Sequence, residues 1–99
     1  MKVYIAGKIT GLKMPFVILK FLKTKLILKK EGHSVMSPSV LGFNAGFEHS
    51  DYMHICFAMI DVCDAIYMQK DWVKSKGAKM ELDYAKKHKK QIFYENERL

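Results

Sequence analysis

The sequence predicts an α/β fold in which helices cover both faces of a mostly parallel sheet. Two observations support this prediction. Short β-rich apolar runs alternate with longer segments of helical periodicity, and strands that are linked by helices in this way run parallel. The 99 residues also suffice for one hydrophobic core and not for two. We therefore expect one domain over residues 1–99, with about four strands and three helices.

The first half of the chain predicts two strands with a helix between them. A β-rich run at residues 3–6 ends at the loop 7–11, which contains two glycines. A lysine-rich amphipathic helix follows and is expected to end at Gly32, because glycine readily adopts the left-handed conformation that closes many helices. Residues 33–36 then form a second strand, which stops before Pro38.

The second half predicts the remaining helices and strands. Segment 37–49 contains proline, glycine and asparagine and is expected to be a loop, after which Ser50 caps a helix over residues 51–62. The later elements follow in the order of a strand at 64–68, a loop at 69–75, a helix at 76–89 and a strand at 91–94. This arrangement is a minimal Rossmann-like, or flavodoxin-like, domain.

The first helix carries two apolar stripes. At about 100° per residue, one stripe contains Ile18, Leu19, Leu22 and Leu26, and the other contains Val17, Phe21 and Leu28. One stripe can pack on the sheet, which leaves the other to pack on a second subunit. We therefore expect a homodimer or a higher homo-oligomer.

The composition is that of an ordinary globular domain with an excess of positive charge. Hydrophobic residues make up 49% and charged residues 27% of the chain, and the formal net charge is +7. Lysines concentrate at residues 20–30 and 86–90. This charge suits an anionic partner, either a nucleotide or a nucleic-acid backbone, although the lysines are also explained as the solvated faces of two helices.

Neither a targeting segment nor a metal site is evident in the sequence. Residues 1–7 lack the apolar core of a signal peptide, and lysines interrupt the apolar stretch 16–28. Cys56 and Cys63 lack the C-x-x-C spacing of metal and redox sites, which favours buried, reduced thiols. We therefore expect a cytoplasmic protein that binds no membrane, no metal and no cofactor.

Three loops are expected to meet at the carboxyl ends of the parallel strands, where α/β proteins bind their ligands. These loops span residues 7–11, 37–49 and 69–77. The acidic residues at this edge are Glu48, Asp51, Asp71 and Glu81, whereas Asp61 and Asp64 fall at the opposite edge. The last loop leads directly into a helix, whose unpaired N–H groups and positive dipole end favour an anion such as a phosphate.

Five segments of the chain together resemble a known group of proteins. They are Tyr4-Ile5-Ala6-Gly7-x-Ile9-Thr10-Gly11, Gly32-His33-x-Val35, Asp51-Tyr52-Met53, Cys63-Asp64-Ala65-Ile66-Tyr67-Met68 and Trp72-x-x-Ser75-x-Gly77-Ala78-x-x-Glu81. In this order and spacing they resemble the small bacterial and phage branch of the nucleoside 2-deoxyribosyltransferase-like superfamily. The resemblance spans nearly the whole chain. It implies a Rossmann-like oligomer that cleaves the N-glycosidic bond of a nucleoside or a nucleotide.

The resemblance also implies roles for individual residues. Glu81 matches the carboxylate that attacks the anomeric carbon, and Tyr4 matches the tyrosine that holds this carboxylate through a hydrogen bond. Ser75 matches the phosphate-binding serine of the monophosphate hydrolases, and together with Lys8 it favours a nucleoside 5′-monophosphate. The other expected substrate-binding residues are Gly7, Ile9, Thr10, Gly11, Gly77 and Ala78.

The departing base needs a proton, and the sequence offers three donors for it. Asp51 is the first candidate, with His49 and His54 as substitutes. The alternative for Asp51 is a structural role, because a carboxylate in the first turn of a helix stabilises the positive end of the helix dipole.

Four positions depart from the pattern of the superfamily. Lys8 stands where relatives commonly have proline, Asp71 where they have glycine, Val73 where an acidic residue is frequent and Cys56 where aspartate is frequent. These departures keep a second function open, a catalytically silent module that binds or senses nucleotides. A nucleic-acid-binding protein is a third interpretation, which we rank last because no recognition motif is apparent.

Overall fold

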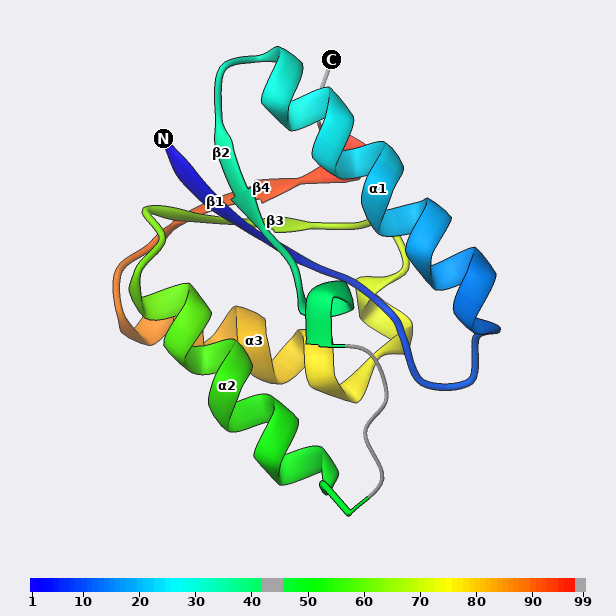
Figure 1. Cartoon of the computed structure of the whole chain (residues 1–99). Coiled ribbons are helices and arrows are strands. Elements are labelled where there is room, and N and C mark those ends of the chain that lie inside the picture. Colours follow the sequence, from blue (N-terminus) through cyan, green and yellow to red (C-terminus); the bar gives the residue numbers. More distant parts are fainter. Residues whose placement is uncertain (42–45, 98–99) are drawn as a thin grey trace.

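Strands and helices alternate throughout the computed structural model, which describes residues 1–41 and 46–97 (Figure 1). The strands are β1 (Lys2–Ala6), β2 (Ser34–Met36), β3 (Ala65–Met68) and β4 (Gln91–Tyr94). The α-helices are α1 (Met14–Lys30), α2 (His49–Asp61) and α3 (Lys76–Lys87). Short 3-10 helices lie at Pro38–Leu41 (η1), Trp72–Lys74 (η2) and Glu95–Glu97 (η3).

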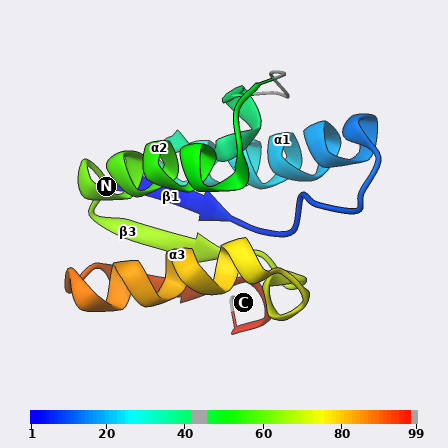
Figure 2. The ribbon, with the colours of Figure 1, turned by 90° about the horizontal axis from the view of Figure 1, so that it is seen from below.

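The strands form one parallel sheet in the order β2-β1-β3-β4. Helix α1 covers one face of this sheet, and α2 and α3 cover the other (Figure 1). Figure 2 views the molecule from the side of α2 and α3, with β1 and β3 visible between the two helices. The predicted α/β fold, with helices on both faces of a four-stranded sheet, is confirmed.

The central strand β1 is apolar on both sides because both faces of the sheet are covered. Val3 and Ile5 pack with the buried side chains of α1, whereas Tyr4 and Ala6 point to the opposite side and pack with those of α2 and α3. This alternation directs the ring of Tyr4 into the space between the sheet and the two helices.

The structure decides which stripe of α1 faces the sheet. Val17, Phe21 and Leu28 are buried there, while the side chains of the other stripe, at positions 18, 19, 22 and 26, are between 45% and 65% exposed. Thr24 lies on the buried side too, between the apolar residues. The stripe that remains exposed is continuous over several turns, which is unusual for a surface that has no partner.

Light scattering tests the homo-oligomer that this exposed stripe predicts. At micromolar concentration we expect a mass of at least two chains, because pairing of two such stripes removes leucine and isoleucine side chains from water. Leu19→Lys places a charge at the most exposed position of the stripe and is expected to shift the mass to that of one chain. A monomeric parent protein would contradict the prediction.

The ends of the first two helices follow their local sequence. Gly32, with a φ of +94°, closes α1 as predicted, and the His33 N–H donates to the Leu28 carbonyl in the manner of a Schellman motif. The prediction that Ser50 caps the middle helix was wrong, since α2 begins at His49 and its N-cap is Glu48. The Glu48 side chain accepts the amide of Asp51, and Asp51 Oδ2 accepts the amide of Glu48 at 2.7 Å, so a reciprocal capping box fixes the start two residues earlier than predicted.

Smaller differences from the predicted elements lie at their boundaries. Helix α3 ends at Lys87 and not at residue 89, because Lys89 adopts a left-handed φ of +58°. The predicted loop 37–49 contains η1, and its residues 42–45 lie outside the described part of the chain. Within residues 1–41 and 46–97, no helix is long and apolar enough to cross a membrane.

Candidate active site

A cavity of about 700 Å³ lies at the carboxyl ends of β1, β2 and β3. Its lining includes residues 7–10 after β1, residues of η1 after β2, and residues 74–78 at the start of α3. The beginnings of α1 and α2 contribute Met14 and His49. The predicted meeting of the three loops is therefore confirmed for their described residues, and the volume is typical of a small-molecule site.

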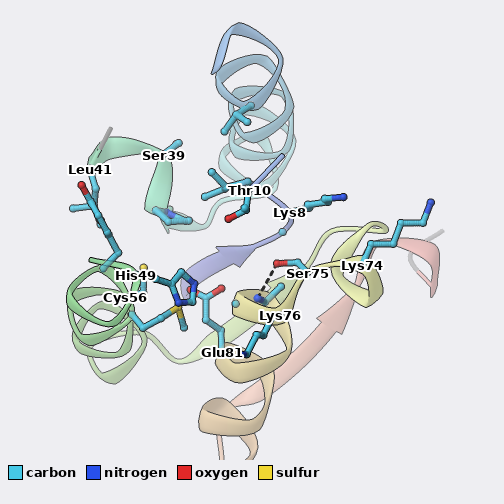
Figure 3. A pocket seen from close by; sticks show the side chains of 18 of the residues that line it. Lys8, Thr10, Ser39, Leu41, His49, Cys56, Lys74, Ser75, Lys76 and Glu81 are labelled. Atoms are coloured by element: carbon cyan, nitrogen blue, oxygen red, sulfur yellow. Dashed lines mark hydrogen bonds between the residues drawn. The ribbon is translucent and has the colours of Figure 1, made fainter. Parts of the chain in front are cut away.

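Glu81 is the acidic side chain among the described residues that line this cavity (Figure 3). It lies on the buried side of α3, where positions 78, 81, 82 and 85 share one face, and only 4% of the residue is exposed. Its carboxylate Oε2 accepts a hydrogen bond from the Tyr4 hydroxyl of β1. The Cys56 thiol of α2 is a second hydrogen-bond partner. Three elements thus hold one carboxylate at the cavity.

The environment of Glu81 favours its protonated form. Burial raises the pKa of the Glu81 carboxyl from 4.5 to about 7, although the hydrogen bonds from Tyr4 and Cys56 act in the opposite direction. Burial and the charge of Glu81 also raise the pKa of Tyr4 well above 10, and that of Cys56 to about 12. Tyr4 and Cys56 therefore remain neutral, and Glu81 changes its charge near neutral pH.

Ser75 fixes the start of α3 at the cavity. Its Oγ accepts the amide of Ala78 at 3.1 Å, which is a side-chain N-cap. The serine hydroxyl still has its own hydrogen to donate. Gly77 lies close to α2, since a Cβ atom there would be 3.4 Å from His49 Nε2. The first turn of α3 thus presents backbone N–H groups to the cavity with His49 beside them.

The three candidate proton donors lie in different places. His49 lines the same cavity as Glu81, and its Nε2 would be 3.4 Å from a Cβ atom at Gly77, about one turn before Glu81 in α3 (Figure 3). Asp51 does not line the cavity, because its carboxylate belongs to the capping box of α2, in the structural role that was its alternative. His54 is exposed and lies outside the lining as well. The geometry therefore brings His49 together with Glu81 and separates Asp51 from it.

Positively charged side chains line part of the cavity. Lys8, Lys74 and Lys76 contribute to its lining, and in Figure 3 Lys8 and Lys74 lie on the same side as Ser75. Of the predicted substrate-binding residues, those at positions 7–10, 75, 77 and 78 line the cavity. Gly11 does not, and its φ of +87° shows that it serves the turn into α1.

Asp71 and Lys8, two departures from the superfamily pattern, are joined by a hydrogen bond. The Lys8 amide donates to Asp71 Oδ1 at 3.1 Å, and this bond needs both an N–H, which proline lacks, and a side-chain acceptor, which glycine lacks. Asp71 also forms an ion pair of 2.8 Å with Lys20. The sequence had placed Lys20 among solvated lysines, although its position beside Val17, Phe21 and Thr24 on the helix signals the buried side.

Cys56 is the contact of Glu81 that sequence reasoning did not assign. Its spacing from Met53 and Ile60, the other buried residues of α2, places it on the face toward the sheet, and this spacing was the available signal. Cys56 and Cys63 are both buried, free thiols, as predicted. Among the described residues, no three His, Cys, Asp or Glu side chains gather into a group that could hold a metal ion.

Comparison with known proteins gives one result at the level of the family. Comparison with curated proteins finds no similar sequence. The family model described as "Domain of unknown function (DUF4406)" matches residues 1–94, which is nearly the whole chain. The protein therefore belongs to the DUF4406 family.

Proposed function

We propose that the protein cleaves the N-glycosidic bond of a nucleoside or a nucleoside 5′-monophosphate, with Glu81 as the nucleophile. One observation carries the proposal: a buried carboxylate faces a cavity of small-molecule size and is held by a tyrosine hydroxyl. The resemblance of the sequence to the nucleoside 2-deoxyribosyltransferase-like superfamily supports the same reaction. The buried, free cysteines are consistent with our proposal of a cytoplasmic location.

The reaction begins with attack by the ionised Glu81. A carboxylate oxygen forms a bond to the anomeric carbon while the bond from this carbon to the base nitrogen breaks, through a state with oxocarbenium character. The bonding electrons leave with the base, which takes up a proton. Water, or a second base, then displaces Glu81 and regenerates the carboxylate. Tyr4 keeps the carboxylate oriented, and Cys56 is a second hydrogen-bond partner that fixes it.

The entrance to the cavity suits the anionic end of a nucleotide. A 5′-phosphate can accept hydrogen bonds from the backbone at the start of α3 and from the Ser75 hydroxyl, with Lys8 and Lys74 nearby. This arrangement supports the monophosphate over the nucleoside.

His49 is the proton donor in this proposal, and a pair of variants tests it. His49→Ala is expected to lower the rate of base release by roughly 10²-fold or more, since a positioned acid contributes that much. Asp51→Ala is expected to lower stability by about 1 kcal/mol through loss of the capping box, with base release near the parental rate. The rates are measured by chromatography of the released base. If Asp51→Ala lowered the rate of base release more than His49→Ala did, Asp51 and not His49 would be the proton donor.

The experiment that tests the function is incubation of the purified protein with a panel of nucleosides and nucleoside 5′-monophosphates. We expect release of free base from at least one monophosphate. A second candidate, the catalytically silent nucleotide-binding module, is favoured by the placement of Asp51 outside the cavity. Thermal stabilisation by a nucleotide without any base release would support this second candidate.

A further inference from the structure

The backbone of Lys8, in the cavity wall, is held at both its amide and its carbonyl. The amide donates to Asp71 Oδ1 at 3.1 Å, and the carbonyl accepts from Lys20 Nζ at 2.8 Å. Lys20 and Asp71 also pair directly at 2.8 Å. Lys20 of α1 and Asp71 of the loop after β3 therefore contact each other, and each also binds the backbone of Lys8.

A buried polar layer lies directly beneath this loop. The Gln69 side chain donates to the Lys20 carbonyl at 3.2 Å and to Thr24 Oγ1 at 2.9 Å. A Cβ atom at Gly7 would be 2.0 Å from Gln69 Oε1 and 3.0 Å from Lys20 Nζ. Gly7 therefore rests on these side chains without space beneath it, and the loop cannot move inward.

We propose that Lys20 and Asp71 are positioning residues that fix residues 7–10 opposite the start of α3. This inference rests on the proposed function, because the distance between this loop and the start of α3 sets the width of the proposed nucleotide site. With its amide and carbonyl both occupied, Lys8 has only its side chain to offer to an anion. A loop that is fixed before binding avoids the cost of ordering it when the substrate enters.

The opposite end of β1 supplies a matched control. There Asp64 Oδ2 accepts the amide of Lys2 at 2.9 Å, so an aspartate beside β3 again holds a backbone amide at an end of β1. This bond lies at the edge of the sheet away from the cavity. Asp64→Ala therefore removes the same kind of hydrogen bond without touching the proposed site.

The test measures hydrogen exchange of the Lys8 amide by NMR in the parent protein, Asp71→Ala and Asp64→Ala. Asp71→Ala is expected to speed exchange at Lys8 by about tenfold or more, since a hydrogen bond to a charged group is lost. Asp64→Ala is expected to leave it unchanged. Asp71→Asn retains an acceptor for the amide and is expected to restore part of the protection.

These variants, together with Lys20→Met, are assayed for nucleoside 5′-monophosphate hydrolysis and for binding of inorganic phosphate. Asp71→Ala and Lys20→Met are expected to raise KM about tenfold while kcat changes less than about threefold, because the loop acts on binding and not on Glu81. Asp64→Ala is expected to change neither constant.

The outcomes separate this inference from the proposed function. Unchanged exchange at Lys8 in Asp71→Ala would overturn the inference, and so would faster exchange with parental KM and phosphate affinity. A parent protein that releases no base, yet binds phosphate more tightly than Asp71→Ala does, would remove the proposed function and support the positioning role. A parent that binds neither phosphate nor a nucleotide would overturn both.

Discussion

Replacing Glu81 by glutamine is expected to lower the rate of base release by roughly 10³-fold or more, because an amide cannot take the place of the nucleophilic carboxylate. Glutamine has nearly the same size and keeps an oxygen that can accept the hydrogen bond from Tyr4. The variant should therefore remain folded with its cavity intact. Chromatography of the nucleotide panel gives the rate, and circular dichroism checks the fold.

Asp83→Asn is the matched control for this variant. Asp83 lies in the same helix, two residues after Glu81, but it is exposed and does not line the cavity. The control removes one negative charge from α3 and is expected to keep the parental rate. Equal losses in the two variants would mean that the charge of α3 matters and not the position of the carboxylate.

Glu81→Gln is also expected to stabilise the fold relative to the parent protein above neutral pH. The raised pKa of Glu81, about 7 against 4.5 for a free glutamate carboxyl, means that the folded state binds this proton more tightly than the unfolded state. The favourable contribution is fully present below pH 4.5 and is lost as the pH rises through about 7. The total change corresponds to about 3 kcal/mol of unfolding free energy.

Urea unfolding between pH 4.5 and pH 8.5 measures this effect as the difference between Glu81→Gln and the parent. The difference isolates Glu81 from the other acidic groups, which titrate in both proteins. We expect Glu81→Gln to gain stability relative to the parent as the pH rises, and to gain no more above about pH 8. A difference that does not depend on pH would show that burial does not raise the pKa of this carboxyl.

The sequence carried enough information for the fold because its local signals agree with one another. The apolar runs of β1 and β3 are continuous, as expected for strands covered on both faces, and Gly32 marks the end of α1. The stripes on α1 were also visible, but periodicity alone does not say which stripe packs on the sheet. That choice depends on the shape of the sheet surface, which is a tertiary property.

The site was predicted in part, and the limit has a physical reason. The pair of Glu81 and Tyr4 was predicted from the resemblance and not from the local pattern, and in the structure both side chains lie in the space between the sheet and α3. The role of Asp51 depended on the start of α2. Since Glu48 and not Ser50 is the N-cap, the Asp51 carboxylate is used in the capping box. The ion pair of Lys20 with Asp71 joins residues 51 positions apart, and no local signal reports such a contact.

The most direct test of the central claim, that Glu81 attacks the sugar, is to locate the covalent intermediate by mass spectrometry. The protein is mixed with a nucleoside 5′-monophosphate that it cleaves, or with the 2′-fluoro analogue of that substrate to slow turnover. The mixture is then quenched in acid and the protein is digested. We predict a sugar-phosphate ester on the peptide that contains Glu81, at that residue. An ester on a different residue, or complete release of the base with Glu81 unmodified throughout, would contradict the mechanism.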